Sequence, residues 1–429
     1  MKMKSVKLAA LFLSTFFLLG SSAFAAPVEV SLADSVSMAL AHSRDIKLAE
    51  IAKEKAIWAV KQAEANKGVS LDFSHTDKHY SSPTTIGNSS GTNRFDNQLS
   101  VSYPLYSGGK LEGQIRKAGL DVEIADAAIT VNQQQIQETV TTCYYNLLQY
   151  QKELEVNKEM VDNYKEHLRI VENQYEIGTV AKADVLASQV ELADAEDTLI
   201  QTQKNYQVAL AQLNDLLGLS LDSQLQLKEA LTYEKNNMSF EECVQEAMKN
   251  RPELIQYLGK IASAQEDIKI AESGKRPNVS LGLSQSWYDK ELLGFDNGSW
   301  QVSLTTSWNL FDSGLTQSQR KQSEKSLESV KEEERQKREA IVLEVKEAYL
   351  GMREAEKRIG TKKAAIEQAQ ESLKIAEARY QVGMGTNLAV FDAVVALNKA
   401  KINDIKALYD YNNSKAQLDK AIGSQVHMK

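Results

Sequence analysis

The hydrophobic residues of this chain recur with a helical period over two very long stretches, which begin after Gly109 and after Gly314. Each pattern continues for about 65 residues, and an α-helix of that length extends on the order of 100 Å. In the first stretch the apolar positions alternate steps of four and three, with Asn157 as the one interruption. They are Ile136, Val140, Cys143, Leu147, Tyr150, Leu154, Val161, Tyr164, Leu168, Val171 and Tyr175. Such a seam predicts left-handed packing against a partner helix.

Both long patterns stop at a glycine, Gly178 in QYEIGTVAKADVLA and Gly383 in RYQVGMGTNLAVFD. Glycine readily adopts the left-handed conformation that ends a helix. Seams rich in Leu and Ala then resume and run to Leu217 and Ile422. We therefore predict two helical hairpins, with tips near residues 175–184 and 380–392.

Strict alternation of apolar and small polar residues marks two other regions, near 68–106 and 277–311. The loops inside them, near 80–94 and 289–298, are rich in Ser, Gly, Asn and Thr. The alternating positions are Val69, Leu71, Phe73, Leu99, Val101, Tyr103, Leu105, Val279, Leu281, Leu283, Trp300, Val302, Leu304, Thr306, Trp308 and Leu310. This pattern predicts four strands, paired as two hairpins.

The whole succession of patterns occurs twice. A shift of 205 residues places Tyr175 on Tyr380 and Gly178 on Gly383. Upstream the shift is 208, and each copy begins with a shorter helical part, at about 31–66 and about 239–275. A unit of about 200 residues is far longer than a solenoid repeat. The sequence therefore predicts two structural repeats, 26–226 and 227–429.

The chain begins with lysines followed by a short apolar run and Ala23-Phe24-Ala25, the pattern of a signal peptide over residues 1–25 that exports the mature protein. Later in the chain no stretch approaches the roughly 18 to 20 apolar residues of a spanning helix. The net charge of −8 disfavours nucleic acid as a partner. Any contact with a membrane therefore has to use the strands or the surface.

The predicted strands have the pattern of an outer-membrane barrel, with apolar side chains toward lipid and polar side chains toward a lumen. Three of the four Trp residues, Trp287, Trp300 and Trp308, lie in this part of the chain. Four strands cannot close a barrel, because the smallest membrane barrels have about eight. We therefore expect an oligomer, with eight strands in a dimer or twelve in a trimer.

With these features the chain resembles the outer membrane efflux protein family, the TolC-like channel-tunnels. The resemblance covers essentially the whole mature chain. It rests on the signal peptide, the duplication, the PLYSGG and NLFDSG turns after the strands, the QYEIG and RYQVG tips, and the endings at Gly218 and Gly423. Each short motif is unspecific, but their order at a constant shift is specific.

The resemblance implies a mainly α fold with a β-barrel part, in which a homotrimer forms one twelve-stranded barrel in the outer membrane and a twelve-helix tunnel in the periplasm. It implies a passive exit duct of a tripartite efflux or type I secretion system, not an enzyme. The partners implied are outer membrane lipid, a periplasmic adaptor at the helical tip, and through it an inner-membrane pump of the RND or ABC type. The helices from Ser31 to His42 and from Ser239 to Asn250 would form a belt around the tunnel.

By the same resemblance, residues at the tips form a gate at the periplasmic entrance. Asp392 takes the place of a ring aspartate, Asp184 that of a linking aspartate, and Tyr380 that of a linking tyrosine. Ala389 and Gly385 stand where a second aspartate and a linking arginine are expected. The contacts that hold the entrance closed are therefore looser or use other residues. Three symmetry-related carboxylates at a narrow mouth attract cations and repel one another.

Each tip residue also has a structural interpretation. The two aspartates could cap or solvate the start of a descending helix. Tyr175 and Tyr380 fit packing in the helical seam better than a linking role. Gly178 and Gly383 shape the turns, which by resemblance form an adaptor-docking surface together with Tyr175.

No other chemistry emerges from the sequence. None of the five histidines, His42, His75, His79, His167 and His427, stands with Cys or carboxylates at metal-ligand spacing, so no metal or cofactor is predicted. Cys143 and Cys243 are interpreted as small apolar residues on helices, with a disulfide between them as the alternative.

Two other functions compete with the duct. A periplasmic adaptor would also be exported and would also contain a long helical hairpin, but it should have one hairpin, and this chain predicts two. A structural coiled-coil protein would leave the aromatic-rich strands unexplained. The transported substrate, the identity of the pump and adaptor, and the way in which the entrance locks are not encoded in these patterns.

Overall fold

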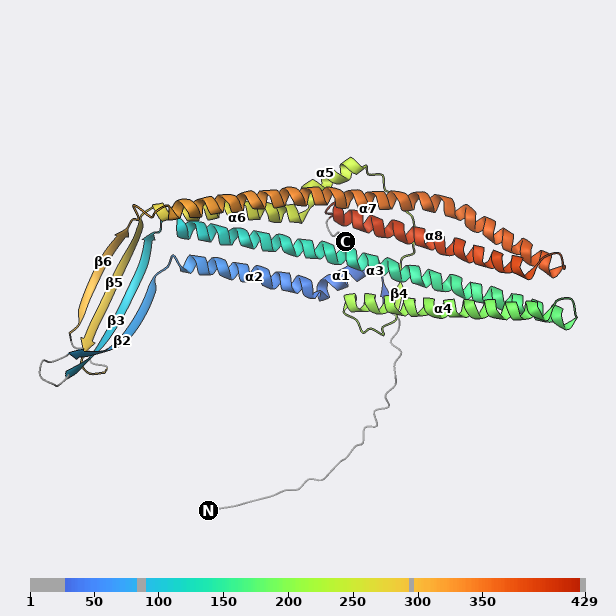
Figure 1. Ribbon diagram of the computed structural model, residues 1–429, viewed down its shortest axis with the longest axis horizontal. Helices are drawn as coiled ribbons and strands as arrows, with labels where there is room; N and C mark the ends of the chain where they lie inside the picture. The colour runs from blue at the N-terminus through green and yellow to red at the C-terminus, as the bar shows by residue number, and fades with distance from the viewer. Residues whose placement is uncertain (1–27, 83–89, 293–296, 425–429) are drawn as a thin grey trace, which may run out of the picture.

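The computed structural model describes residues 28–82, 90–292 and 297–424. The predicted signal peptide and parts of the two predicted strand loops lie outside these residues. Figure 1 shows an elongated molecule, with a sheet at one end and helices along the rest of its length.

Four long helices form two hairpins that run side by side. Helix α3 (Lys110–Glu176) and helix α7 (Leu315–Gln381) each have 67 residues, while α4 (Lys182–Leu217) has 36 and α8 (Asn387–Ala421) has 35. The near-identical lengths follow from the duplication. The predicted helical hairpins are confirmed, with α3 packed along both α4 and α8.

The tips require glycine for a reason of backbone geometry alone. Gly178 and Gly383 have φ angles of 79° and 74°, in the left-handed region. The turns close when the N–H of Thr179 donates to the carbonyl of Gln174 at 2.9 Å and that of Met384 to Arg379 at 2.8 Å. A Cβ on either glycine would meet nothing within 4 Å, so space is not what excludes a side chain.

The four predicted strands are present and form one antiparallel sheet in the order β2-β3-β5-β6. Their bounds are Ser70–Ser82, Ser90–Tyr106, Asn278–Asp289 and Ser299–Ser307. One row of paired residues crosses the whole sheet, Leu71, Val101, Leu283 and Val302. Strand β6 ends before Trp308, where the alternation predicted a longer strand.

One face of this sheet is apolar and exposed. Its exposed side chains are Leu71, Phe73, Leu99, Tyr103, Leu105, Leu281, Leu283, Trp300, Val302 and Leu304. Among the described strands, β2 and β6 each have one neighbour and form the sheet edges. Such a face and two such edges need covering by something outside the chain.

A two-stranded parallel sheet was not predicted from the sequence. Strand β1 (Val28–Val30) pairs with β4 (Leu225–Leu227), and this pairing joins the start of the first repeat to the segment that follows α4. Strands of three residues are too short to produce a recognisable period.

Each shorter helical part consists of two helices. The first is α1 (Leu32–His42) and α2 (Arg44–Ala65), separated at Ser43, whose side chain caps α2. The second is α5 (Phe240–Asn250) and α6 (Pro252–Glu272), followed by a single 3-10 turn, η1 (Ser273–Lys275). Pro252 favours an extended residue before it, so the chain bends at Arg251.

Within the described residues, the core forms three separate clusters along the molecule. One lies in each repeat, around Leu210 in the first and around Met352 in the second, and the third joins both hairpins near the tips. Cys143 packs against the first cluster and Cys243 belongs to the second, and both thiols are free. The interpretation of both cysteines as apolar helix residues is therefore confirmed.

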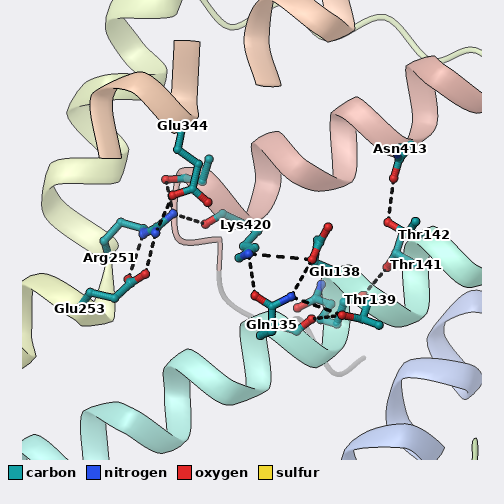
Figure 2. A network of polar contacts seen from close by, with 12 residues as sticks. Gln135, Glu138, Thr139, Thr141, Thr142, Arg251, Glu253, Glu344, Asn413 and Lys420 are labelled. Carbon is teal, nitrogen blue, oxygen red and sulfur yellow. Dashed lines mark hydrogen bonds and ion pairs between the residues drawn. The ribbon is translucent and has the colours of Figure 1, made fainter. Parts of the chain in front are cut away.

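A polar network holds the end of α8 against the rest of the molecule (Figure 2). Arg251 is 2% exposed, and its guanidinium bonds Glu253 at 2.6 Å and Glu344 at 2.9 Å. It also donates to the carbonyl of Ala421 at 3.3 Å. On the preceding residue, the Lys420 ammonium donates to Gln135 of α3 at 2.7 Å. The Arg251 bonds all lie within the second repeat, and the bond from Lys420 to Gln135 joins the two repeats.

Candidate functional site

The two tips lie at the same end of the molecule, opposite the sheet (Figure 1). All the predicted site residues lie within or beside the tips, because the two hairpins have matching lengths and α3 packs against α8. The end of the molecule farthest from the exposed apolar sheet is therefore the candidate functional site.

Tyr380 lies in the buried seam as predicted. Its side chain is 5% exposed, and its ring centroid lies 4.9 Å from that of His167 on α3. Burial raises the pKa of the Tyr380 hydroxyl, and the negative charge of Asp184 raises it further. Within the described residues this hydroxyl is buried without a hydrogen-bond partner. Tyr380 and Asp184, each predicted as a linking residue, thus interact electrostatically, but no hydrogen bond joins them.

The seam prediction is wrong for Tyr175. Its side chain is 44% exposed, whereas Val171, one turn earlier, is buried. Tyr175 lies in the last turn of α3, where the hairpin reverses and the partner helix has not yet begun. An exposed aromatic ring at the tip is compatible with its other predicted role in docking.

The two aspartates differ in position. Asp392 is exposed and is the sixth residue of α8, and the cap of that helix is Thr386, which accepts from the N–H of Ala389 at 3.3 Å. The capping interpretation is therefore wrong for Asp392. Asp184 is half-buried in the first turn of α4, where a negative charge interacts favourably with the helix dipole.

A buried polar network, here called the tip network, links the two hairpins. It consists of His167, Ser188, Asn387 and the main-chain oxygen of Asp184. His167 Nε2 lies 2.5 Å from Asn387 Oδ1, and Asn387 Nδ2 donates to the Asp184 carbonyl at 3.1 Å and to Ser188 Oγ at 3.2 Å. The three side chains come from α3, α4 and α8.

Sequence reasoning did not find the tip network. A signal was present, since His167 and Ser188 are polar residues within otherwise apolar seams. Asn157, noted only as an interruption, is likewise buried, and it donates to Thr202 at 2.8 Å and accepts from Asn398 at 3.0 Å. Polar residues inside the seams therefore mark places where three helices meet.

The outermost surface of the tips includes several exposed apolar side chains. Ile177 lies on the first turn, and Val382 and Met384 lie on the second. The exposed apolar side chains there are Tyr175, Ile177, Leu186, Val382, Met384 and Leu388. Isolated exposed apolar residues are ordinary, but six on or beside the two tip turns indicate a contact surface.

The described residues contain no group of His, Cys, Asp and Glu that could hold a metal ion. In the same part of the chain, every helix falls short of the length or the apolar character that crossing a membrane requires.

The family description "Outer membrane efflux protein" matches residues 35–219 and 243–424, which include both repeats. This chain belongs to the outer membrane efflux protein family. The predicted resemblance is confirmed, and the boundaries of the two matched regions agree with the duplication.

Individual relatives are distant. Outer membrane protein TolC of Escherichia coli strain K12 is 23% identical over 314 residues, which are 70% of this chain and 64% of that protein. The pyoverdine export outer membrane protein OpmQ of Pseudomonas aeruginosa is 22% identical over 363 residues, 81% of this chain and 76% of OpmQ. A solved structure of CusC has a TM-score of 0.80 at 19% identity, with 92% of each chain covered. That structure supports the fold.

Proposed function

We propose that this outer membrane protein is the passive exit duct of a tripartite efflux or type I secretion system. The observation that carries the proposal is the sheet at one end of the molecule, which has an exposed apolar face and two open edges. The sheet leads into two helical hairpins, in each of which the longer helix has 67 residues. A bilayer accepts a sheet only when every edge is paired. Closure therefore requires further copies of the chain.

Three copies fit the proposal best. They would supply twelve strands, and the helices of the three copies would continue the barrel as a tunnel of about 100 Å. A dimer of eight strands is the alternative, which the family resemblance does not favour. The apolar row from Leu71 to Val302 would face lipid.

The tips would meet a periplasmic adaptor, and through it an inner-membrane pump. The apolar side chains on the two tip turns, including Ile177, Val382 and Met384, support this role because they offer a contact surface at the end farthest from the membrane. Energy would come from the pump. The pump would also select the substrate, whether drug, metal ion, peptide or protein.

The entrance gate would include Asp392, with Asp184 and Tyr380 as linking residues. In a trimer, three exposed Asp392 carboxylates would stand around one mouth and favour cations. The adaptor alternative is overturned by the family match, which extends over both repeats.

The test is conductance of the purified full-length protein in a planar bilayer, after detergent extraction from the outer membrane. A duct gives discrete current steps. A protein that remains water-soluble, monomeric and silent contradicts the proposal.

The gate is tested in the same bilayer with Asp392→Ala. We expect higher conductance or weaker cation preference, because the ring of negative charge is removed. Glu176→Ala, which removes another acid near the tips, is the matched control. Selectivity equal to that of the original channel would remove Asp392 from the gate.

A further inference from the structure

We infer that a groove between α3, α4 and α8 is a binding site for small amphipathic organic cations that pass through the duct. The groove lies where α3 has α4 on one side and α8 on the other (Figure 1). This inference rests on the proposed function. It gives the duct a substrate class of its own, in addition to selection by the pump.

The groove has the size and the lining of a small-molecule site. Its volume is about 430 Å³, within the range of sites that hold ligands of drug size. The apolar side chains that line it are Met160, Tyr164, Ala195, Val395 and Ile402. Val395 is 51% exposed, so a ligand that covered it would remove apolar surface from water.

The amides that line the groove already have partners within the protein. Asn398 Nδ2 donates to Asn157 Oδ1 at 3.0 Å, and Asn157 Nδ2 donates to Thr202 Oγ1 at 2.8 Å. These groups therefore need no hydrogen bond from a ligand, and an apolar body can lie against them without leaving a buried donor unpaired.

The charge of the lining is negative. Glu153, Glu191 and Asp194 line the groove together with Lys399, so carboxylates outnumber ammonium groups there. The pKa of the Tyr164 hydroxyl is raised to about 12, first by burial and then by the nearby charge of Glu191. Negative charge beside an apolar surface fits a cation with an apolar body. A bare metal ion fits less well, since the described residues contain no group of His, Cys, Asp and Glu that could hold one.

The position of the groove on α8 indicates on which side of the tunnel wall it opens. Val395, Lys399 and Ile402 follow the gate aspartate, Asp392, by three, seven and ten residues, which places them on the same side of the helix. In the proposed gate Asp392 faces the mouth of the tunnel. The groove then opens into the lumen, between about 5 and 15 Å beyond the gate along α8. A small molecule in transit reaches it there, whereas a protein bound outside the tunnel does not.

The duplication indicates that the helical hairpin does not need these acids. In the second repeat Arg358 takes the place of Glu153, and Lys399 takes the place of Asp194. Helices α7 and α8 nevertheless form a hairpin of nearly the same lengths as α3 and α4. The acids of the groove are therefore not a requirement of the fold, which favours a role in binding.

The test measures binding of tetraphenylphosphonium to the purified full-length protein by equilibrium dialysis in detergent. Glu191→Gln/Asp194→Asn should weaken binding by about tenfold, because it removes two negative charges and keeps the size of both side chains. Tetraphenylborate has nearly the same shape and the opposite charge. Its binding should not weaken in this variant. Equal losses for the two ions would overturn the inference, since the acids would then not select for charge.

Glu196→Gln/Asp197→Asn is the matched control, because it removes the same charges from exposed positions of the same helix outside the groove. It should leave binding of both ions unchanged. Val395→Ser should weaken binding of both ions severalfold, since it removes apolar surface and no charge. Unchanged binding in Val395→Ser would mean that the ions bind elsewhere.

Asp392→Ala separates the groove from the gate. It should lower the affinity for tetraphenylphosphonium less than Glu191→Gln/Asp194→Asn does, because the gate carboxylate lies outside the groove. A larger loss in Asp392→Ala would assign the binding to the gate and contradict the inference.

Conductance in planar bilayers distinguishes this inference from the proposed function. Tetraphenylphosphonium should block the current of the original channel, and about tenfold more of it should be needed in Glu191→Gln/Asp194→Asn. If the channel conducts and that variant binds the phosphonium as tightly as the original protein, the groove is not a cation site and the duct stands. If these acids bind the phosphonium but the protein never conducts, the proposed function fails and the cation site stands.

Discussion

Asp419 and Asn214 occupy equivalent positions in the two repeats, and only Asp419 can become charged. Asn214 is fully buried, and its amide donates to the carbonyls of Leu221 at 3.1 Å and Ser223 at 2.8 Å. Burial raises the pKa of Asp419 to about 6, although the charge of Lys415 lowers it in part. The second repeat therefore holds a carboxyl group where the first holds a neutral amide.

This difference predicts a pH-dependent effect of Asp419→Asn. Since the folded pKa exceeds the unfolded value of 3.8, the stabilising contribution of protonated Asp419 is complete below pH 3.8 and is lost as the pH rises through about 6. At pH 8 the free energy of unfolding of the variant should be higher by on the order of 1–3 kcal/mol, so it should unfold at a higher temperature. At pH 4 it should resemble the original protein. Thermal unfolding in detergent at both pH values measures this. Asp215→Asn, which changes an exposed aspartate beside Asn214 in the first repeat, is the control and should alter the stability at neither pH. Equal stabilisation of Asp419→Asn at pH 4 and pH 8 would show that charge is not the cause.

At the scale of elements, glycine has opposite effects at a tip and inside a helix. Gly383 has a φ of 74°, whereas Gly360 lies within α7, and a Cβ at either position meets nothing within 4 Å. Gly383→Ala should lower stability by about 1–2 kcal/mol, because a side chain disfavours the left-handed conformation. Gly360→Ala should raise stability by about 0.5–1 kcal/mol through lower entropy of the unfolded chain.

Denaturant unfolding of the two variants checks the signs. Loss of stability in both would indicate that a neighbouring surface, rather than backbone conformation, excludes the side chain at residue 360.

For the molecule as a whole, the exposed face of the sheet decides where the protein resides. Leu304 belongs to the apolar face, paired with Leu281, while the next residue, Thr305, points to the opposite face. Leu304→Arg should reduce outer-membrane assembly by about 2–4 kcal/mol, because it would place a charge in lipid. Thr305→Arg should be tolerated, since it would face a lumen.

The measurement is the fraction of each variant recovered as folded oligomer from the outer membrane. Equal recovery of the two variants would mean that the Leu304 face does not contact lipid, and it would contradict the barrel.

Much of this architecture was predictable because the period of the apolar residues along the chain distinguishes helices from strands. The helical period after Gly109 predicted about 65 residues for α3, which has 67, and alternation identified β2, β3, β5 and β6. The prediction for Tyr175 failed at the end of that same pattern, because a seam residue is buried only where a partner helix lies opposite. Arg251 was missed because nothing local distinguishes a buried arginine from the exposed ones nearby.

The sequence by itself determined the long helices, the four strands of the larger sheet, their duplication and the glycine turns, since each depends on residues close together along the chain. Only the tertiary structure decided which polar residues meet. His167 and Asn387 are separated by 220 positions, and Arg251 and Glu344 by 93. Such contacts depend on how the hairpins dock, and local periods carry no information about which polar side chains docking brings together.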